Sequence, residues 1–279
     1  MKKILRSLKI NGFVKNPIKI LSKTEINQLK TQIKKISKKR DLNKNPFIEI
    51  CGHNKILDNL VEKILKNDSI QNTLENVLGK NYILWGGGSI RISRPNEKGL
   101  LFHQDAPGET GLIFLVNDQP KSSTVVFKSS HLFPRVCKYL SWNSPKIILK
   151  IKKLLSPLTG SAGDHFFWFY KTWHGRLPNQ SNEEYISLFF PFFPQGTDRL
   201  KLLKETNEER VKNVNSNYIK NLMNNYKLKN QKPNNEKLCN KIEKFEFMNF
   251  LKINFYVFIF KFFLLEIVFF PVRILRVFK

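Results

Sequence analysis

Hydrophobic positions recur at helical spacing in two parts of the first third of the chain. In the first, Ser22 and Glu25 have the spacing of a capping box, in which two side chains satisfy the free N–H groups at a helix start. The residues after this box form one apolar helix face: Ile26, Leu29, Ile33 and Ile36. The pattern predicts an amphipathic helix here and a second helix from about residue 57 to residue 78.

From residue 89 the pattern changes to short apolar or alternating runs separated by turn residues. Such runs, bounded by Gly, Pro, Asn and Asp, are typical of antiparallel strands. Five strands are predicted, at residues 89–93, 111–116, 124–127, 166–170 and 185–193. Together with the helices they favour a mainly β fold with flanking helices, in which the strands form a double-sheet jelly roll.

Two segments within this β region carry candidate metal chemistry. His103 and Asp105 are two residues apart, so on an extended strand both side chains point to one face and can bind the same ion. His174 supplies a second imidazole from a distant segment. Two histidines and one carboxylate are typical of non-haem Fe(II) oxygenases, because they leave three coordination positions open. We therefore predict an iron site; the alternative is that both histidines are ordinary, partly buried residues.

The order of these segments resembles the phytanoyl-CoA dioxygenase family of Fe(II)/2-oxoglutarate-dependent oxygenases, over residues 8 to 195. Residues 11–14 and 21–25 are similar to its first strand and following helix, and Leu-Leu-Phe-His-Gln-Asp at 100–105 resembles its metal-binding strand. Residues 125–131 are similar to its Pro-Gly-Ser-His turn, and residues 163–181 resemble its distal histidine segment. The resemblance implies a double-stranded β-helix, with His103, Asp105 and His174 as the catalytic iron ligands and 2-oxoglutarate as cosubstrate.

The chemistry implied by the resemblance is the oxidation of a C–H bond. Iron, O2 and the 2-oxo acid supply the oxidant, while the protein contributes positioning and a shielded cavity. Because position 105 is a carboxylate, no ligand position is left vacant for a halide. Hydroxylation of a small, lipid-linked or glycan-linked substrate is therefore expected in preference to halogenation.

The chain departs from the family at the arginine that pairs with the far carboxylate of 2-oxoglutarate. Relatives place it about nine to eleven residues after the distal histidine, where its planar fork binds the carboxylate. Those positions here are Glu183, Glu184 and Tyr185, of which only Tyr185 could donate a hydrogen bond. Other candidates for holding the cosubstrate are Arg176, Arg91, Arg94, Lys128 and Asn179. A relocated arginine, a different cosubstrate and an inactive oxygenase fold all remain open.

Two other classes of protein fit parts of the pattern. One is a non-catalytic jelly-roll module that binds glycan or tethers partners at a membrane. The other is a cupin-like iron enzyme that works without a 2-oxo acid. Metal content separates the first from an oxygenase, and O2 uptake without 2-oxoglutarate would identify the second.

Composition narrows the cellular setting. The net charge is +26, but the basic residues are spread along the chain without a compact nucleic-acid motif, and AT-rich codons also favour lysine. We therefore expect no specific nucleic-acid binding, and favour attraction to anionic membrane surfaces or to acidic glycans. The three cysteines, Cys51, Cys137 and Cys239, are widely spaced and indicate neither a zinc site nor a disulfide framework. A reducing cytoplasm is the expected compartment, including a peripheral position at the inner face of a membrane.

The organisation along the chain predicts three parts: an oxygenase-like domain at 1–198, a polar helical or linker segment at 199–244, and a hydrophobic basic tail helix at 245–279. Within the tail, Lys261 and Glu266 interrupt the apolar stretch, so an interfacial helix is favoured over a spanning one. A helix packed on the jelly roll or in a dimer is the third alternative. A basic insertion at 133–158 could cover the mouth of the site, and charges at Arg6 and Lys9 argue against a signal peptide.

Overall fold

The computed structural model describes residues 2–16, 18–38, 47–97, 99–121, 124–132, 155–197 and 199–227. These residues belong to the first of two compact units, Met1–Asn235. The predicted tail helix at 245–279, residues 133–154 of the insertion, Cys137 and Cys239 lie outside the described residues. Among the helices that the structure describes, none has the length and apolar character needed to cross a membrane.

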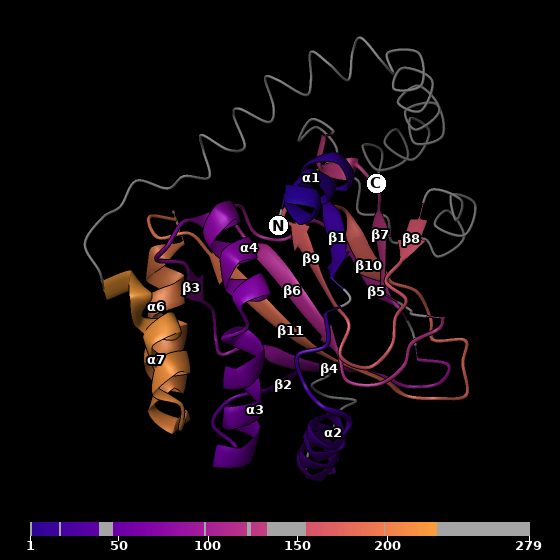
Figure 1. Cartoon of the computed structure of the whole chain (residues 1–279), viewed down its shortest axis with the longest axis horizontal. Helices are drawn as coiled ribbons and strands as arrows, with labels where there is room; N and C mark the ends of the chain where they lie inside the picture. Colours follow the sequence, from indigo (N-terminus) through magenta and orange to yellow (C-terminus); the bar gives the residue numbers. More distant parts are fainter. Residues whose placement is uncertain are drawn as a thin grey trace, which may run out of the picture. The chain divides into compact units, whose positions relative to one another are not determined.

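The described strands form two antiparallel sheets (Figure 1). The larger sheet contains, in order, β1 (Phe13–Asn16), β9 (His165–Phe169), β6 (Thr110–Leu115), β11 (Tyr185–Phe193), β4 (Ser89–Ser93) and β2 (Phe47–Glu49), with β3 (Ile83–Leu84) paired to β11. The smaller sheet contains β5 (Leu100–His103), β10 (His174–Arg176), β7 (Thr124–Phe127) and β8 (Leu155–Pro157). The predicted mainly β architecture is confirmed, and three of the five predicted strands have the predicted bounds.

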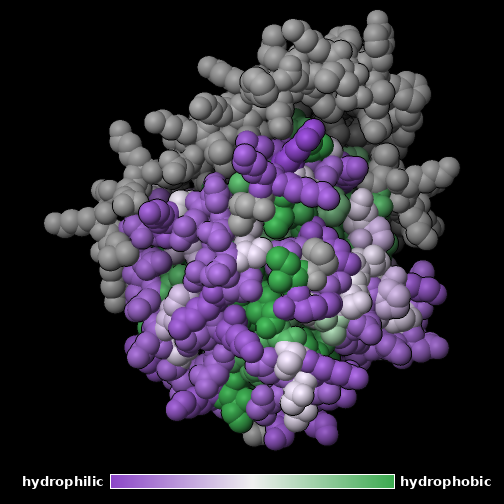
Figure 2. All heavy atoms as spheres, in the orientation of Figure 1, coloured by the Kyte–Doolittle hydropathy of each residue, from purple (hydrophilic) through white to green (hydrophobic). Residues whose placement is uncertain are grey.

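Helices cover the outer face of the larger sheet. In Figure 1, α4 (Asp68–Leu78) lies in front of the sheet, and α3 (Lys55–Leu65) and α2 (Lys23–Ser37) are seen below the strands. The capping box at Ser22 and Glu25 is present, and α2 buries the four predicted residues: Ile26, Leu29, Ile33 and Ile36. Figure 2 shows mostly hydrophilic side chains on this side of the molecule, with a narrow hydrophobic strip through the middle. These helices are therefore amphipathic, with their apolar faces towards the sheet.

The prediction of one helix at 57–78 is wrong, because the chain makes two helices there. Helix α3 ends at Leu65, and Asn67 begins α4 by accepting a hydrogen bond from the Ser69 N–H at 3.1 Å. An asparagine at an N-cap competes with continuation of the preceding helix. The apolar spacing runs through both helices, so hydrophobic periodicity alone does not reveal the break.

The two faces of the larger sheet pack against different hydrophobic clusters. Along β11, Ile186, Leu188 and Phe190 join the core beneath the helices. The alternate residue Phe189 packs on the opposite face, against a smaller cluster that includes Trp168 of β9 and Val126 of β7. That inner face looks towards the smaller sheet, and the space between the sheets is where a jelly roll places a ligand site.

Residues 199–227 form the helices expected there, but they are not exposed throughout. The segment contains α6 (Leu200–Arg210) and α7 (Asn217–Asn224). Ile219 and Met223 of α7 are fully buried in the main core. In addition, α1 (Lys2–Asn11), which the hydrophobic pattern did not predict, precedes β1. The proposed domain boundary at 198 and the linker up to 244 stay predictions.

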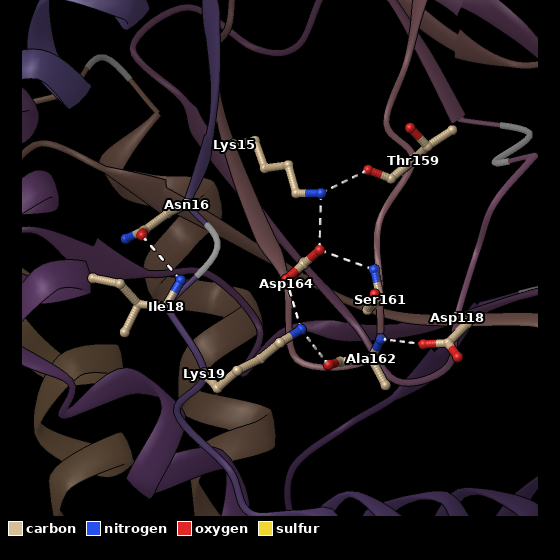
Figure 3. Close-up of polar contacts among 9 residues, drawn as sticks. All are labelled: Lys15, Asn16, Ile18, Lys19, Asp118, Thr159, Ser161, Ala162 and Asp164. Atoms are coloured by element: carbon tan, nitrogen blue, oxygen red, sulfur yellow. Dashed lines mark hydrogen bonds and ion pairs between the residues drawn. The ribbon is translucent and has the colours of Figure 1, made fainter.

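A turn just before β9 is held to β1 and to the segment after β1 by polar contacts (Figure 3). The Asp164 carboxylate forms ion pairs with Lys15 Nζ at 2.9 Å and with Lys19 Nζ at 2.7 Å. It also accepts a hydrogen bond from the Ser161 N–H at 2.9 Å. Burial alone would raise the pKa of Asp164, but these hydrogen bonds outweigh it and hold the pKa below its ordinary value. Asp164 is thus a structural turn residue.

Candidate metal centre

Strand pairing in the smaller sheet brings the two histidines together. His103 is the last residue of β5 and is the direct register partner of His174, the first residue of β10. Their ring centroids lie 4.5 Å apart. Residues that are distant in sequence thereby become neighbours at one end of the sheet, as the prediction of a shared site requires.

Asp105 lies just beyond the end of β5, where the chain is held by the segment after β9. The Asp105 N–H donates to the Tyr170 carbonyl at 3.0 Å, and the Gln104 amide donates to the Lys171 carbonyl. The pair of ligands at positions i and i+2 therefore does not lie entirely on a regular strand. Hydrogen bonds from outside β5 set the direction of the carboxylate.

The donor atoms of His103, Asp105 and His174 converge. Asp105 Oδ1 lies 3.4 Å from His174 Nε2 and 3.7 Å from His103 Nε2, and one ligand atom from each residue lies within 4.8 Å of the others. Ligands that each sit about 2.1 Å from an ion are separated by about 3 Å at right angles. A small inward adjustment of these side chains would therefore suffice to hold a divalent transition metal.

The state of His174 suits a metal ligand. Its Nδ1 lies 3.0 Å from the Thr172 carbonyl, so the Nδ1–H tautomer donates there and leaves the Nε2 lone pair facing Asp105. Burial lowers the pKa of His174, and the Asp105 carboxylate opposes that shift. The buried imidazole is thus neutral at neutral pH, which is the form that binds a metal.

The three ligands differ in their exposure. The side chains of Asp105 and His174 are each 9% exposed, whereas that of His103 is 50% exposed. The candidate site is consequently buried on the side of the larger sheet and open on the side of β5. An ion held here would be reached past His103.

Trp168 has a role at the site that the sequence pattern did not indicate. Its indole N–H donates to Asp105 Oδ2 at 2.7 Å, and its ring centroid lies 5.0 Å from that of His174. Trp168 also packs in the hydrophobic cluster between the sheets. Its alternation on the inner face of β9 is the one sequence signal that could have pointed to the site.

Arg91 lies on the inner face of the larger sheet. Its register partner in β11 is Ser187, its Nε donates to the Ser89 hydroxyl at 3.1 Å, and its guanidinium lies 5.0 Å from the centre of the Phe189 ring. Burial lowers the pKa of Arg91 to about 10, and the cation of Arg176 adds to this effect. Arg91 remains protonated at neutral pH, so it places a largely desolvated positive charge between the sheets.

Glu109 is a second buried ionisable group at the site, and the sequence pattern gave no sign of it. It is 5% exposed and lies immediately before β6, on the inner face by the alternation of that strand. Burial raises the pKa of Glu109 well above its ordinary value, and Asp105 raises it further, while Arg91 opposes the shift. Glu109, Asp105 and Arg91 thus share one electrostatic environment.

The other candidates for holding a cosubstrate have different surroundings. Arg176 forms an ion pair with Glu97 at 2.7 Å. Asn179 donates to the carbonyls of Ser93 and Glu183, so its side chain fixes the loop before β11. Tyr185 is buried at the start of β11, opposite Ser93.

The two remaining basic candidates for binding the cosubstrate, Arg94 and Lys128, have exposed side chains. Arg94 lies 4.0 Å from Glu184, with both side chains substantially exposed. Lys128 follows β7 and is exposed. Among the predicted basic residues, Arg91 is the one whose charge is shown to interact with Asp105.

Comparisons with known proteins agree on the fold. No protein-family model matches the chain, and no curated protein sequence matches it. Membership of the phytanoyl-CoA dioxygenase family therefore stays a prediction. Solved structures do match, at sequence identities that show the shared fold alone.

Three of these structures illustrate the likeness. HygX from Streptomyces hygroscopicus, with nickel and 2-oxoglutarate bound, has a TM-score of 0.56 at 11% identity, covering 70% of this chain and 88% of HygX. The non-haem α-ketoglutarate-dependent carbocyclase SnoK, from nogalamycin biosynthesis, has a TM-score of 0.53 at 15% identity, covering 73% of this chain and 90% of SnoK. AviO1 from Streptomyces viridochromogenes Tue57 has a TM-score of 0.52 at 12% identity, covering 70% and 96%.

Proposed function

We propose that this protein is an Fe(II)- and 2-oxoglutarate-dependent oxygenase. The observation that carries the proposal is the convergence of His103, Asp105 and His174, whose donor atoms lie within 4.8 Å of one another at one end of a jelly roll. Two imidazoles and a carboxylate are the donor set that non-haem iron oxygenases use. HygX and SnoK, which share the fold, support the same reaction type.

The residues present fit a divalent iron ion. His174 is neutral, and its tautomer is fixed by Thr172, as a metal-binding histidine requires. Asp105 supplies a negative charge that a cation would balance. Iron with 2-oxoglutarate and O2 would supply the oxidising power for C–H hydroxylation. The chain's own contribution is to orient the ligands and to exclude water through the aromatic cluster around Trp168 and Phe189.

Arg91 is the proposed partner for the far carboxylate of 2-oxoglutarate. The family carries an arginine about nine to eleven residues after the distal histidine, and the last of these positions is Tyr185, which lies on β11 beside β4. Arg91 comes from β4 and pairs in register with Ser187, two residues further along β11. A guanidinium from the neighbouring strand can thus reach the region that a β11 arginine would serve. Its planar fork suits a carboxylate, and its charge is strengthened by the dry surroundings.

The proposed substrate is a small molecule, free or carried on a lipid or glycan. HygX has been determined with hygromycin B bound, which supports a small-molecule substrate for this fold. The opening beside the half-exposed His103 gives a substrate access to the ligand set. The carboxylate at Asp105 favours hydroxylation over halogenation, since it occupies the position that a halide would need.

An anaerobic Fe(II) titration tests the metal site. Wild type should bind about one equivalent, and His103→Ala and Asp105→Ala should each bind far more weakly. Circular dichroism establishes that the variants are folded. Equal and negligible binding in all three proteins would contradict the proposal.

Cosubstrate use is tested separately. Fe(II)-loaded wild type should convert 2-oxoglutarate to succinate in air during a screen of small-molecule substrates. Strong iron binding without succinate in any condition would retain the metal site and exclude 2-oxoglutarate as cosubstrate. O2 uptake without 2-oxoglutarate would then favour the cupin-like alternative.

A further inference from the structure

The two oxygens of the Asp105 carboxylate have different partners. Oδ1 faces the two histidines, at 3.4 Å from His174 Nε2 and 3.7 Å from His103 Nε2. Oδ2 accepts the indole N–H of Trp168 at 2.7 Å. One oxygen is therefore turned towards the ligand set, while the other is held by a donor that cannot bind a metal.

The indole is fixed from several sides, so its N–H has a defined direction. Trp168 is 3% exposed, and its ring stacks on Phe189 with centroids 5.5 Å apart and an angle of 10° between the planes. Its other neighbour is His174, at 5.0 Å between centroids. Since Phe189 lies on β11, the indole extends from β9 across β6.

Gly111 of β6 makes this position possible. It is the register partner of Trp168, and a Cβ at residue 111 would lie 2.5 Å from Cε2 and 2.8 Å from Nε1 of the indole. Contacts under 3.0 Å are too short for a carbon atom, so any side chain here would displace the ring. The glycine therefore provides the space in which the indole reaches Asp105.

We infer that Trp168 is a positioning residue that restricts Asp105 to binding a metal through one oxygen. This inference rests on the proposed function. A carboxylate that bound through both oxygens would take two coordination positions and leave too few for cosubstrate and O2. By occupying Oδ2, the indole keeps Oδ1 as the single ligand atom and preserves the three open positions of the ligand set.

Cobalt(II) is a suitable probe, because its visible absorption depends on coordination number and geometry. Full-length wild type, Trp168→Phe and Gly111→Ala are titrated with Co(II) alone. Trp168→Phe removes the N–H and keeps most of the ring, whereas Gly111→Ala keeps the N–H and moves the ring. Both should weaken Co(II) binding by about 10- to 100-fold, the range for loss of an outer-shell partner, and both should change the visible spectrum.

Trp85→Phe is the matched control. The Trp85 indole N–H is buried and has no hydrogen-bond partner in the part of the chain that the structure describes. The same chemical change at this position should leave Co(II) affinity and spectrum as in wild type. A Trp168→Phe or Gly111→Ala protein with the wild-type spectrum overturns the proposal, even if its affinity falls, because a general loss of packing would explain that result.

The outcomes separate this inference from the proposed function. Wild type that binds Co(II), with Trp168→Phe indistinguishable from it, overturns the role of Trp168 and leaves the metal site intact. Wild type that binds no Co(II) overturns both.

A measurement on wild type covers the case in which neither variant folds. In Co(II)-loaded protein labelled with [15N]tryptophan, one of the four indole N–H signals should be strongly shifted by the nearby metal and slow to exchange. The absence of such a signal overturns the proposal.

Discussion

The two ends of β9 hold buried carboxylates with opposite surroundings. At the start, Asp164 is surrounded by Lys15, Lys19 and a backbone N–H, which neutralise it within the chain. Beyond the other end, Asp105 faces two imidazoles and accepts one indole N–H. Asp164 is complete as a structural ion pair, whereas Asp105 is held so that one oxygen faces two imidazoles. The difference separates a carboxylate that stabilises the fold from the one that we propose as a metal ligand.

The histidines near the two ends differ in the same way. His174 has Thr172 on Nδ1 and Asp105 near Nε2, so each nitrogen has a defined direction. His165, next to Asp164, is fully buried, and neither of its nitrogens has a hydrogen-bond partner among the described residues. Burial alone therefore does not mark a ligand. What marks it is a fixed tautomer with the free nitrogen facing a carboxylate.

The largest expected effect is the loss of Fe(II) affinity when Asp105, rather than Asp164, is replaced by alanine. Asp105→Ala should lower Fe(II) affinity by roughly 100-fold or more, because ligand bonds in metal sites contribute about 3 kcal/mol each. Asp164→Ala should bind Fe(II) like wild type but unfold at lower denaturant concentration. Anaerobic metal titration and urea unfolding of both variants measure this. Parallel losses of metal affinity in the two variants would contradict the assigned division.

Replacing His165 should change how stability depends on pH. Burial lowers the pKa of His165 to about 4, below its unfolded value of about 6.5. The unfolded state therefore takes up the proton first as pH falls, and stability declines between pH 6.5 and 4. His165→Leu should remove roughly 3 kcal/mol of that decline. Urea unfolding at pH 7 and pH 4 measures it, and an unchanged pH dependence would show that the burial of His165 is not what destabilises the fold in acid.

Arg91 on β4 and Arg94 just after β4 provide a test variant and a matched control for 2-oxoglutarate binding. Arg91→Met should weaken 2-oxoglutarate binding to metal-loaded protein by about 10- to 100-fold, because a charge-assisted hydrogen bond in a dry site contributes about 1.5–3 kcal/mol. Arg94→Met, which changes an exposed cation beside Glu184, should bind like wild type. Calorimetric titration compares them. Normal binding by Arg91→Met would direct attention to Arg176 or Tyr185.

Asp164→Asn should give the smallest effect, because its lysine partners are 40% and 49% exposed and solvent screens them. The loss of unfolding free energy at pH 7 should be about 1 kcal/mol. The pKa of Asp164 is lower in the folded state, so its contribution is present above the unfolded value and disappears as pH falls through the folded value. Wild type and variant should therefore converge once the pH falls below the folded-state pKa of Asp164, which lies below that of an ordinary aspartate. A constant difference across this range would mean that the charge is not responsible.

Local sequence signals were sufficient to predict those helices and strands whose start, end and apolar face are set by neighbouring residues. The capping box and apolar face predicted α2, and β4, β7 and β11 were bounded by turn residues. The candidate ligands were chosen from residue type and order, a histidine and a carboxylate two apart with a distal histidine, and the structure brings their donor atoms within 4.8 Å of one another. These features depend on the spacing of residues within a short segment, and that spacing can be read from the sequence.

Features that depend on register between distant strands could not be found this way. The bond between Trp168 and Asp105 joins residues 63 apart, and it requires both the pairing of β9 with β6 and a glycine at 111. Arg91 was one of several basic candidates, because its place beside Ser187 depends on β4 pairing with β11. Glu109 gave no signal, since its burial arises only once the sheets face each other.

The most direct test of the account is an anaerobic calorimetric titration of 2-oxoglutarate into wild type, with and without one equivalent of Fe(II). We predict about one molecule of 2-oxoglutarate bound per chain in the presence of iron, much weaker binding without it, and no effect of iron in Asp105→Ala. Equal affinity with and without iron in wild type would contradict the claim that His103, Asp105 and His174 form the centre at which cosubstrate binds.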